Sequence, residues 1–460
     1  MQQPTQLRWY RSLAAMLIVL PGLICLKPTL AAAQKPRTSI FSLANGMQVV
    51  VIPDHRSPVV THMVWYRVGA TDDPPAKSGL AHFLEHLMFK ATATIKSGEF
   101  TRVVNRLGAR HNALTTHDTT TYFQRTAKEH LSRLMELEAD RMVNLQLDAQ
   151  EVLTERDVIK EERRSSVDAS PIAILNEQML AGLYQNHPYG RPVLGWAHEI
   201  ATLDRDDALA FYKRHYAANN SILVVVGDVT EAGVRELAER TYGRLKPSSG
   251  PLNRDHGRPL EPEHIAARRV HLEDARVSSP LLLRYYHAPS LKSASKGEAE
   301  ALTVLGRILG GDDTSRLYRA LVVERRIAVQ AGADYQSGNR DSGRLALLAL
   351  AAKDRTPAEL EAAMDDVVSA VVSGGVTDEE LTRAKRSLEA QAVFATDNQE
   401  SRARRMGEAL TIGRTLEDVE GEGARIQAVT AADVQTAART YLQLRRSVTG
   451  SLTQPATAKR

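Results

Sequence analysis

Two periodicities of apolar and polar positions run along this chain, and together they predict a mixture of strands and helices. Short apolar runs bounded by turn residues, and one run rich in threonine and aromatic residues, predict strands over 48–52, 59–68, 115–124 and 221–226. Apolar residues at helical spacing predict helices over 79–90, 98–107, 128–144 and 149–167. We expect the first two strands to pair with each other, and the first half of the chain to be α+β.

A stretch rich in proline, glycine and serine interrupts this pattern at 246–262 and predicts a linker. The order of elements then begins again, with strands over 267–272 and 280–287 followed by helices over 298–309 and 315–325. A chain of 460 residues is also longer than one hydrophobic core requires. The repetition predicts two homologous α+β domains, residues 34–245 and 263–460, and only the first contains a histidine-rich motif.

The N-terminal residues 1–33 have the layout of a secretory signal peptide. Arg8 and Arg11 precede an apolar run from Leu13 to Leu26, which is too short to span a bilayer, and small residues end the segment at Ala33. We expect cleavage after Ala33, a periplasmic mature protein and no stable membrane insertion, with a retained anchor or lipidation of Cys25 as alternatives. Cys25 is the only cysteine, so the mature chain has no disulfide.

Composition and charge exclude some classes of function. With 43% hydrophobic and 25% charged residues, the chain has the composition of an ordinary globular protein. Removal of residues 1–33 would take away three of 59 basic residues and no acid, which leaves 56 basic against 55 acidic residues and a formal net charge of +1. The charge therefore gives no support for a nucleic-acid partner or for an anionic membrane surface.

The predicted helix over 79–90 contains the motif that carries chemistry, His82, Glu85 and His86 in the order H-x-x-E-H. Residues four apart lie one turn apart on the same face of a helix, so both imidazoles can reach one ion. Zinc accepts imidazole nitrogen and carboxylate oxygen, and a catalytic zinc site keeps one position for water, from which Glu85 could take a proton. An ordinary amphipathic helix is the alternative, but Leu80, Phe83 and the other apolar residues suffice to pack this helix without the histidines.

A third ligand is expected from the acidic stretch over 151–162. Glu155 and Glu162 are seven residues apart, on one face of a helix, whereas Glu161 is rotated by about 100°. We expect Glu162 to bind the metal and Glu155 to accept a hydrogen bond from a ligand histidine. Taken alone, this stretch would be an ordinary solvated charged helix.

At these residues the sequence resembles the pitrilysin-type inverzincin peptidases, in which the H-x-x-E-H motif is followed by a glutamate in an E-R-x-x-x-x-x-E context. Glu155, Arg156 and Glu162 fit that context. The resemblance extends to the substrate-binding edge strand, to the loop from His187 to Gly195 and to the strand Val224–Asp228, and it includes Asn112, Ala113, Leu114, Thr115, Thr120, Tyr122 and Phe123. It implies one Zn²⁺ per chain, two homologous domains of the processing-peptidase type, and a chamber for unfolded peptide formed by two such chains.

The sequence departs from the family pattern in the second half. Many active members carry there an arginine and a tyrosine seven residues apart, which bind the carbonyl of the scissile peptide, and Val322 and Val329 stand at the matching positions here. The resemblance therefore implies the zinc-bearing subunit of a heterodimer, with a homologous chain that supplies the arginine and tyrosine pair. A homodimer and a non-catalytic structural subunit are the alternatives.

The predicted activity is hydrolysis of peptides or unfolded polypeptide segments, with Glu85 as the catalytic base. Strand addition at Asn112–Thr115 would hold an extended substrate by main-chain hydrogen bonds, and so would select extended segments more than sequence.

Overall fold

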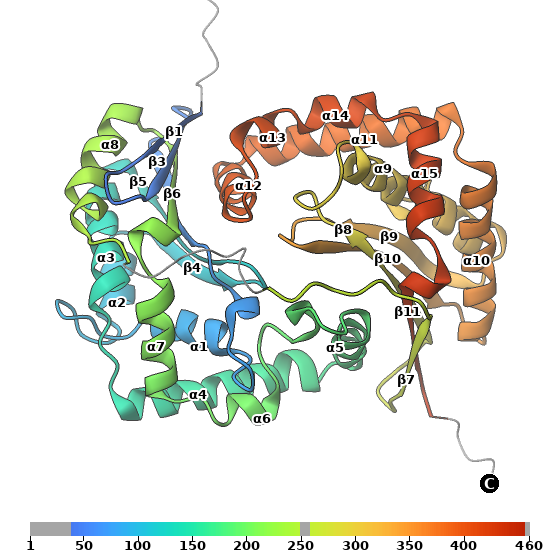
Figure 1. The fold of residues 1–460 in the computed structure, drawn as a ribbon, viewed down its shortest axis with the longest axis horizontal. Coiled ribbons are helices and arrows are strands. Elements are labelled where there is room, and N and C mark those ends of the chain that lie inside the picture. The colour runs from blue at the N-terminus through green and yellow to red at the C-terminus, as the bar shows by residue number, and fades with distance from the viewer. Residues whose placement is uncertain (1–37, 249–257, 456–460) are drawn as a thin grey trace, which may run out of the picture. The chain divides into compact units, whose positions relative to one another are not determined.

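The computed structural model describes residues 38–248 and 258–455, so the predicted signal peptide 1–33 and the middle of the predicted linker lie outside the described residues. Two sheets organise the described chain (Figure 1). The first contains β1 (Ser39–Ser42), β2 (Gln48–Pro53), β3 (Val59–Tyr66), β4 (Arg110–Thr115), β5 (Thr120–Ala127) and β6 (Ser221–Gly227). The second contains β7 (Arg268–Glu273), β8 (Leu281–Pro289), β9 (Ala328–Gln336), β10 (Ser342–Ala351) and β11 (Ser447–Thr453).

The two sheets share one topology. Their strand orders are β1-β2-β6-β3-β5-β4 and β7-β11-β8-β10-β9, so the second repeats the first without a counterpart of β1. In both, the first and last strands of the repeat pair in parallel, β2 with β6 and β7 with β11, and the other pairs are antiparallel. The predicted α+β fold with two homologous halves is therefore confirmed, while the exact boundaries at 245 and 263 stay a prediction.

Two expectations about the first sheet were wrong. The strands over 48–52 and 59–68 do not pair, because β6 lies between β2 and β3 and bonds to both. The single strand expected over 115–124 is a hairpin, with a turn at Thr116–Thr119 that separates β4 from β5. Of the two hairpin strands, β4 lies at the edge of the sheet, so Thr120, Tyr122 and Phe123 of β5 lie one strand inside that edge.

The helices of the first half are α1 (Leu80–Leu87), α2 (Glu99–Arg106), α3 (Leu131–Asn144), α4 (Ala149–Arg163), α5 (Pro171–Leu183), α6 (Ala197–Ile200), α7 (Arg205–His215) and α8 (Glu231–Arg240). Those of the second half are α9 (Glu298–Gly310), α10 (Pro357–Gly374), α11 (Asp378–Asp397), α12 (Gln399–Thr411), α13 (Leu416–Glu420), α14 (Glu422–Ala428) and α15 (Ala431–Tyr441). A π-helical segment ends α4 (Arg164–Asp168), and another, at Tyr318–Glu324, occupies the helix expected over 315–325.

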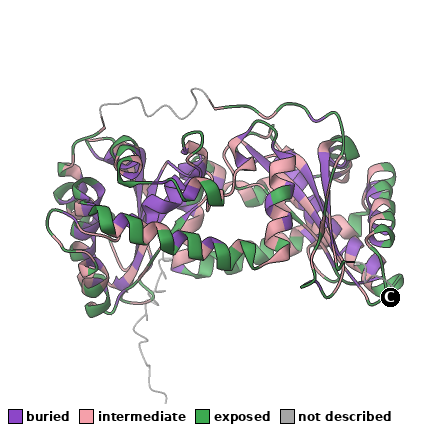
Figure 2. Cartoon of the chain, turned by 90° about the horizontal axis from the view of Figure 1, so that it is seen from below, coloured by how far each residue is buried: buried purple, intermediate pink, exposed green. Residues whose placement is uncertain are grey.

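Each half contributes one helix that packs on the sheet of the other half. Helix α12 packs on β3 and β6 of the first sheet, and α5 packs on β7 and β11 of the second (Figure 1). Both faces of each sheet are thus covered, and the inner strands are mostly buried while the helices keep an exposed side (Figure 2). The edge strands β4, β7 and β9 contain exposed residues. The central strand β6 is buried along its whole length, which explains why its sequence is a continuous apolar run rather than an alternating one.

The exchanged helices approach the sheets closely because a glycine stands at each contact. A Cβ atom at Gly407 of α12 would lie 2.1 Å from the Trp65 indole nitrogen on β3, and one at Gly450 of β11 would lie 2.3 Å from the Met179 sulfur on α5. Each half therefore completes its core with a helix from the other half. No helix among the described residues is long and apolar enough to cross a membrane.

Candidate active site

Helix α1 lies against the edge of the first sheet and positions three of the predicted site residues. Its first turn is fixed by Asp73, whose carboxylate accepts hydrogen bonds from the backbone N–H groups of Gly79 and Ala81 at 2.8 Å each. Burial nevertheless raises the pKa of Asp73 to about 8. Leu80, Phe83, Leu84 and Leu87 are buried in the core, so the remaining face carries His82, Glu85 and His86.

The structure brings His82, His86 and Glu162 together, with one possible ligand atom from each within 4.8 Å of the others. The Nε2 atoms of His82 and His86 lie 3.7 and 3.4 Å from the same carboxylate oxygen of Glu162. Two ligands of one tetrahedral zinc ion, each about 2.0–2.1 Å from the metal, lie about 3.4 Å apart. The donor set of two imidazoles and one carboxylate therefore fits a single zinc ion in both chemistry and spacing.

Glu155 contacts the side of the His86 ring that faces away from Glu162, and it lies two turns before Glu162 on α4. Its Oε1 accepts a hydrogen bond from Nδ1 of His86 at 2.8 Å, and its Oε2 pairs with the Lys90 ammonium at 2.6 Å. These two contacts hold the pKa of Glu155 at about 2, with the His86 hydrogen bond as the larger cause. Because Nδ1 of His86 carries the proton, Nε2 is left with a free lone pair that points toward Glu162 and His82.

Burial lowers the pKa of His82 to about 3, so this imidazole is neutral and able to act as a ligand at neutral pH. Glu85 is also buried, and burial raises the pKa of its carboxyl above the ordinary value. A carboxyl with a raised pKa is better suited to accept and return a proton than a fully solvated one. His86 differs, because burial lowers its pKa but the neighbouring carboxylates, Glu155 above all, outweigh burial and raise it.

Thr115 holds the Glu85 side chain in place, a contact that the sequence did not predict. The hydroxyl of Thr115 donates a hydrogen bond of 2.5 Å to the Glu85 carboxylate, and both side chains are buried. The predicted part of Thr115 in substrate binding rests on its main chain, whereas its side chain points toward α1. The alternation of β4 is the signal that could have found this contact, because Ala113 and Thr115 must face α1 if Asn112 and Leu114 face away.

The other predicted substrate-binding residues lie on β4, at the exposed edge of the sheet. Asn112 and Leu114 are exposed, and Ala113 is half-buried against the core. The expected strand addition needs a free edge with unpaired main-chain groups, and β4 pairs with β5 on one side only.

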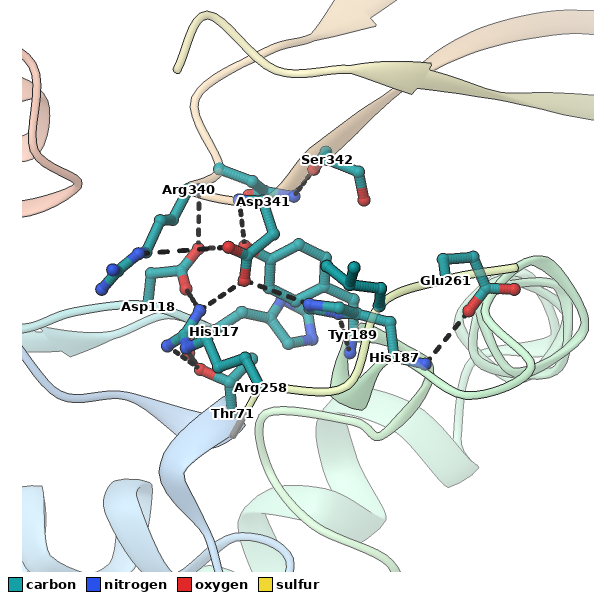
Figure 3. A network of polar contacts seen from close by, with 12 residues as sticks. Thr71, His117, Asp118, His187, Tyr189, Arg258, Glu261, Arg340, Asp341 and Ser342 are labelled. Carbon is teal, nitrogen blue, oxygen red and sulfur yellow. Dashed lines mark hydrogen bonds and ion pairs between the residues drawn. The ribbon is translucent and has the colours of Figure 1, made fainter. Parts of the chain in front are cut away.

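A polar network fixes the tip of the β4–β5 hairpin to the second half of the chain (Figure 3). Asp118 in the turn accepts a hydrogen bond from the Tyr189 hydroxyl and one from the backbone N–H of Arg340. Arg258, from the end of the predicted linker, pairs with Asp118 at 3.0 Å and with Asp341 at 2.5 Å. Nothing in the linker sequence indicated this role.

The same network continues into the loop that carries His187. His187 Nε2 lies 3.1 Å from Asp341, and its Nδ1 accepts a hydrogen bond from the backbone N–H of Tyr189. Glu261, also from the predicted linker, accepts hydrogen bonds from the backbone N–H groups of Gln185, Asn186 and His187. The hairpin that ends beside Glu85 is thus held by residues from the linker and from both halves.

Comparisons with known proteins agree with this fold and site. The family model described as Insulinase (Peptidase family M16) matches residues 48–196, and the model described as Peptidase M16 inactive domain matches residues 202–388. The first match contains the whole predicted metal site, and the second covers a region without the H-x-x-E-H motif.

Relatives with similar sequences carry the name zinc protease. The "Zinc protease PqqE" of Helicobacter pylori is 35% identical over 307 residues, which are 65% of this chain and 67% of that protein. The "Uncharacterized zinc protease Mb2805c" of Mycobacterium bovis is 30% identical over 425 residues, 90% of this chain and 92% of that protein.

Solved structures share the fold. The crystal structure of a protease from Helicobacter pylori superposes with a TM-score of 0.85 and 29% identity, covering 91% of this chain and 99% of that one. The first half of the periplasmic protease PqqL from Escherichia coli has a TM-score of 0.77 at 20% identity, covering 91% and 92% of the two chains, which shows the fold alone.

Fold, site and relatives together define the class as the metallopeptidases with two α+β halves. Within that class, the chain belongs to peptidase family M16, the insulinase family.

Proposed function

We propose that this protein is a zinc-dependent endopeptidase that hydrolyses extended peptides or unfolded polypeptide segments. The observation that carries the proposal is the donor set of His82, His86 and Glu162, beside a buried Glu85 that Thr115 orients. His82, His86 and Glu162 lie close enough to share one ion, and Glu85 lies on the same helix as the two histidines. A structural subunit has no need of such a set.

Each residue has a distinct part in the proposed mechanism. The substrate strand would add to the edge of β4 at Asn112–Thr115, which aligns its main chain beside α1. A zinc ion held by the three ligands would supply Lewis acidity, polarising a carbonyl and making water more acidic. Glu85 would remove a proton from the attacking water and deliver it to the leaving amine, while Thr115 keeps the carboxylate turned toward the reacting atoms.

The second half gives a reason to propose a homologous partner chain. Val322 is packed against the second core and Val329 is 57% exposed, so neither offers the polar contacts of an arginine and tyrosine pair. The nearby Arg325 pairs with Asp366 at 2.9 Å, and the Tyr335 hydroxyl donates to the Pro289 carbonyl at 2.6 Å. We therefore propose a heterodimer in which the second chain supplies that pair.

The fold of this chain corresponds to about half of the full PqqL structure, of which it covers 47%. We further propose a periplasmic location, on the basis of the signal layout in residues 1–33.

The test separates metal binding from catalysis. Residues 34–460 are purified with zinc, the metal content is measured, and cleavage of an unstructured quenched peptide is followed for the chain alone and mixed with a homologous chain that carries the arginine and tyrosine pair. We expect one zinc per chain and cleavage only in the mixture. Cleavage by the chain alone would favour a homodimer, and bound zinc without cleavage in either sample would favour a structural subunit.

The matched variant is Glu85→Gln, which keeps the size of the side chain but removes the base. We expect zinc content to be retained and the cleavage rate to fall by about 10²–10⁴-fold. Activity close to that of the unchanged chain would refute the role of Glu85.

A further inference from the structure

Two arginines face each other at the far end of the edge-strand hairpin. Arg110 on β4 and Arg125 on β5 are register partners, so their side chains lie on the same face of the sheet. Like charges directly opposite each other destabilise a strand pair. Within residues 38–248 and 258–455, neither guanidinium forms a hydrogen bond or an ion pair. The repulsion between the two arginines therefore destabilises the strand pair, and no contact inside the described chain compensates for it.

Arg125 lines a cavity of about 440 Å³ between the sheet and the junction of α11 and α12. Both acids of this cavity are already paired with a cation, because Arg56 binds Asp54, at 2.8 Å, and Asp397, at 2.6 Å. Asp54 also lies 3.4 Å from Arg402. Arg125 is thus the cation in this cavity whose charge remains available to a ligand, as far as the described residues show.

A second polar group in the same cavity lacks a partner. Gln399, the first residue of α12, is only 6% exposed, and its Oε1 accepts no hydrogen bond from the described residues. A buried acceptor without a donor costs free energy unless a ligand or water completes it. The cavity therefore offers an anion-binding guanidinium and a free acceptor, which are the complements of a peptide carboxylate and a peptide N–H group.

The distance between the two arginines and Glu85 follows from the extended geometry of β4. Helix α1 runs beside β4, since Glu85 contacts Thr115 and the Phe89 ring lies 5.6 Å from the His111 ring. Arg110 is five positions before Thr115, which is about 17 Å at the rise of an extended strand. A peptide added to the edge of β4, with its scissile bond beside Glu85, would reach the Arg110 and Arg125 face about three to five residues from that bond.

We propose that Arg110 and Arg125 form a subsite for an acidic side chain, so that the protein prefers extended peptides with Asp or Glu about three to five residues from the scissile bond. The inference deepens the proposed function and rests on it. A carboxylate can accept paired hydrogen bonds from a guanidinium, and its charge relieves the repulsion between the two arginines.

Binding is measured first, because it does not require turnover. The Glu85→Gln chain, with zinc, is titrated against fluorescein-labelled unstructured peptides that differ only by Glu or Gln at one position, moved in steps along the peptide. We expect about tenfold tighter binding of the Glu peptide at one or two adjacent positions. Combining Glu85→Gln with Arg110→Gln and Arg125→Gln should bring the Glu to Gln ratio of affinities close to one.

The control replaces an arginine remote from the hairpin. Arg133→Gln on α3 removes an exposed charge that pairs with Glu136, and it should leave the Glu to Gln ratio unchanged. A charge reversal, Arg125→Glu, should shift the preference toward a Lys peptide, which loss of folding could not do.

The outcomes separate this inference from the proposed function. A Glu preference that the double replacement abolishes, together with no hydrolysis by the unchanged chain and its partner, would support the subsite and overturn the peptidase. Hydrolysis with equal binding of Glu and Gln peptides would overturn the subsite and keep the peptidase. A Glu preference that survives the replacement of both arginines would also overturn the subsite, and absence of both binding and hydrolysis would overturn both proposals.

Discussion

The hydrogen bond between Thr115 and Glu85 joins two elements that otherwise serve separate purposes. Thr115 belongs to the strand that would bind substrate, and Glu85 belongs to the helix that carries the histidines. A buried carboxylate has few ways to turn when one oxygen is held at 2.5 Å by a buried hydroxyl. The edge strand that is proposed to align the substrate therefore also orients the proposed base.

Replacement of Thr115 tests this orientation. Thr115→Val has nearly the same shape but lacks the donor, so the carboxylate loses its hydrogen bond and can rotate away from the reacting atoms. We expect kcat to fall by about tenfold, while KM and zinc content change little. Thr115→Ser keeps the hydroxyl and should restore most of kcat, and a valine variant with unaltered kcat would contradict the role.

The proposed ligand residues could be grouped from the sequence because their geometry is local. His82 and His86 share a face of one helix, as do Glu155 and Glu162, so residue spacing alone indicates the common point. The Thr115 contact depends on which face of β4 turns toward α1, and that follows from long-range pairing with β5. Spacing therefore predicted which helical residues lie together, but it did not predict the contact of the Thr115 side chain with Glu85.

Among the elements, the predicted linker makes specific side-chain contacts that its composition does not indicate. Arg258 and Glu261 from this segment bind the hairpin turn, the loop around His187 and the start of β10. Proline and glycine content predicts an absence of regular structure, and it carries no information on such side-chain contacts. The insertion of β6 between β2 and β3 was missed for a related reason, because parallel pairing across about 170 residues leaves no local signal.

The linker network makes stability depend on pH through Asp341. Burial acts to raise the pKa of this carboxyl, but the His187 hydrogen bond and the Arg258 charge outweigh burial and hold the pKa at about 2. A carboxyl with a depressed pKa stabilises the fold above its unfolded value near 3.8, and the stabilisation is lost as the pH falls toward 2.

We therefore expect the free energy of unfolding to fall by about 2 kcal/mol more between pH 4 and pH 2 in the unchanged chain than in Asp341→Asn. Urea unfolding at several pH values measures both curves. Asp366→Asn is the matched control, since Asp366 is exposed on α10, and its curve should parallel that of the unchanged chain. Parallel curves for Asp341→Asn would show that the network does not stabilise the ionised carboxyl.

For the whole molecule, the exchange of α5 and α12 makes the two halves interdependent. The outer face of the first sheet is covered by a helix that follows β6 by more than 170 residues. Removal of either half would expose an apolar sheet face, so we expect the halves to unfold in one transition.

Gly407→Ala tests this interdependence. The added Cβ would overlap the Trp65 ring, so we expect a loss of about 1–3 kcal/mol in the free energy of unfolding. Gly423→Ala on α14 meets no atom within 4 Å and should stabilise slightly or have no effect. Tryptophan fluorescence reports the first half, since Trp65 and Trp196 both lie there.

A fluorophore attached to Ser369→Cys reports the unfolding of the second half. It labels that position alone, because the chain has no cysteine after Cys25. Both probes should shift to the same lower midpoint in Gly407→Ala. A shift confined to tryptophan fluorescence would show that the halves unfold independently.

The exchanged helix also sets the order of events during synthesis. The last strand of the first sheet ends at Gly227, but its cover is not complete until Thr411 has been made. At a synthesis rate of about 5–20 residues per second, the interval between synthesis of Gly227 and synthesis of Thr411 is about 10–40 s. Throughout that interval Trp65, Val224 and their neighbours lack the helix that buries them. We therefore expect a holding chaperone to bind the apolar sheet face of the nascent first half until almost the entire chain has emerged.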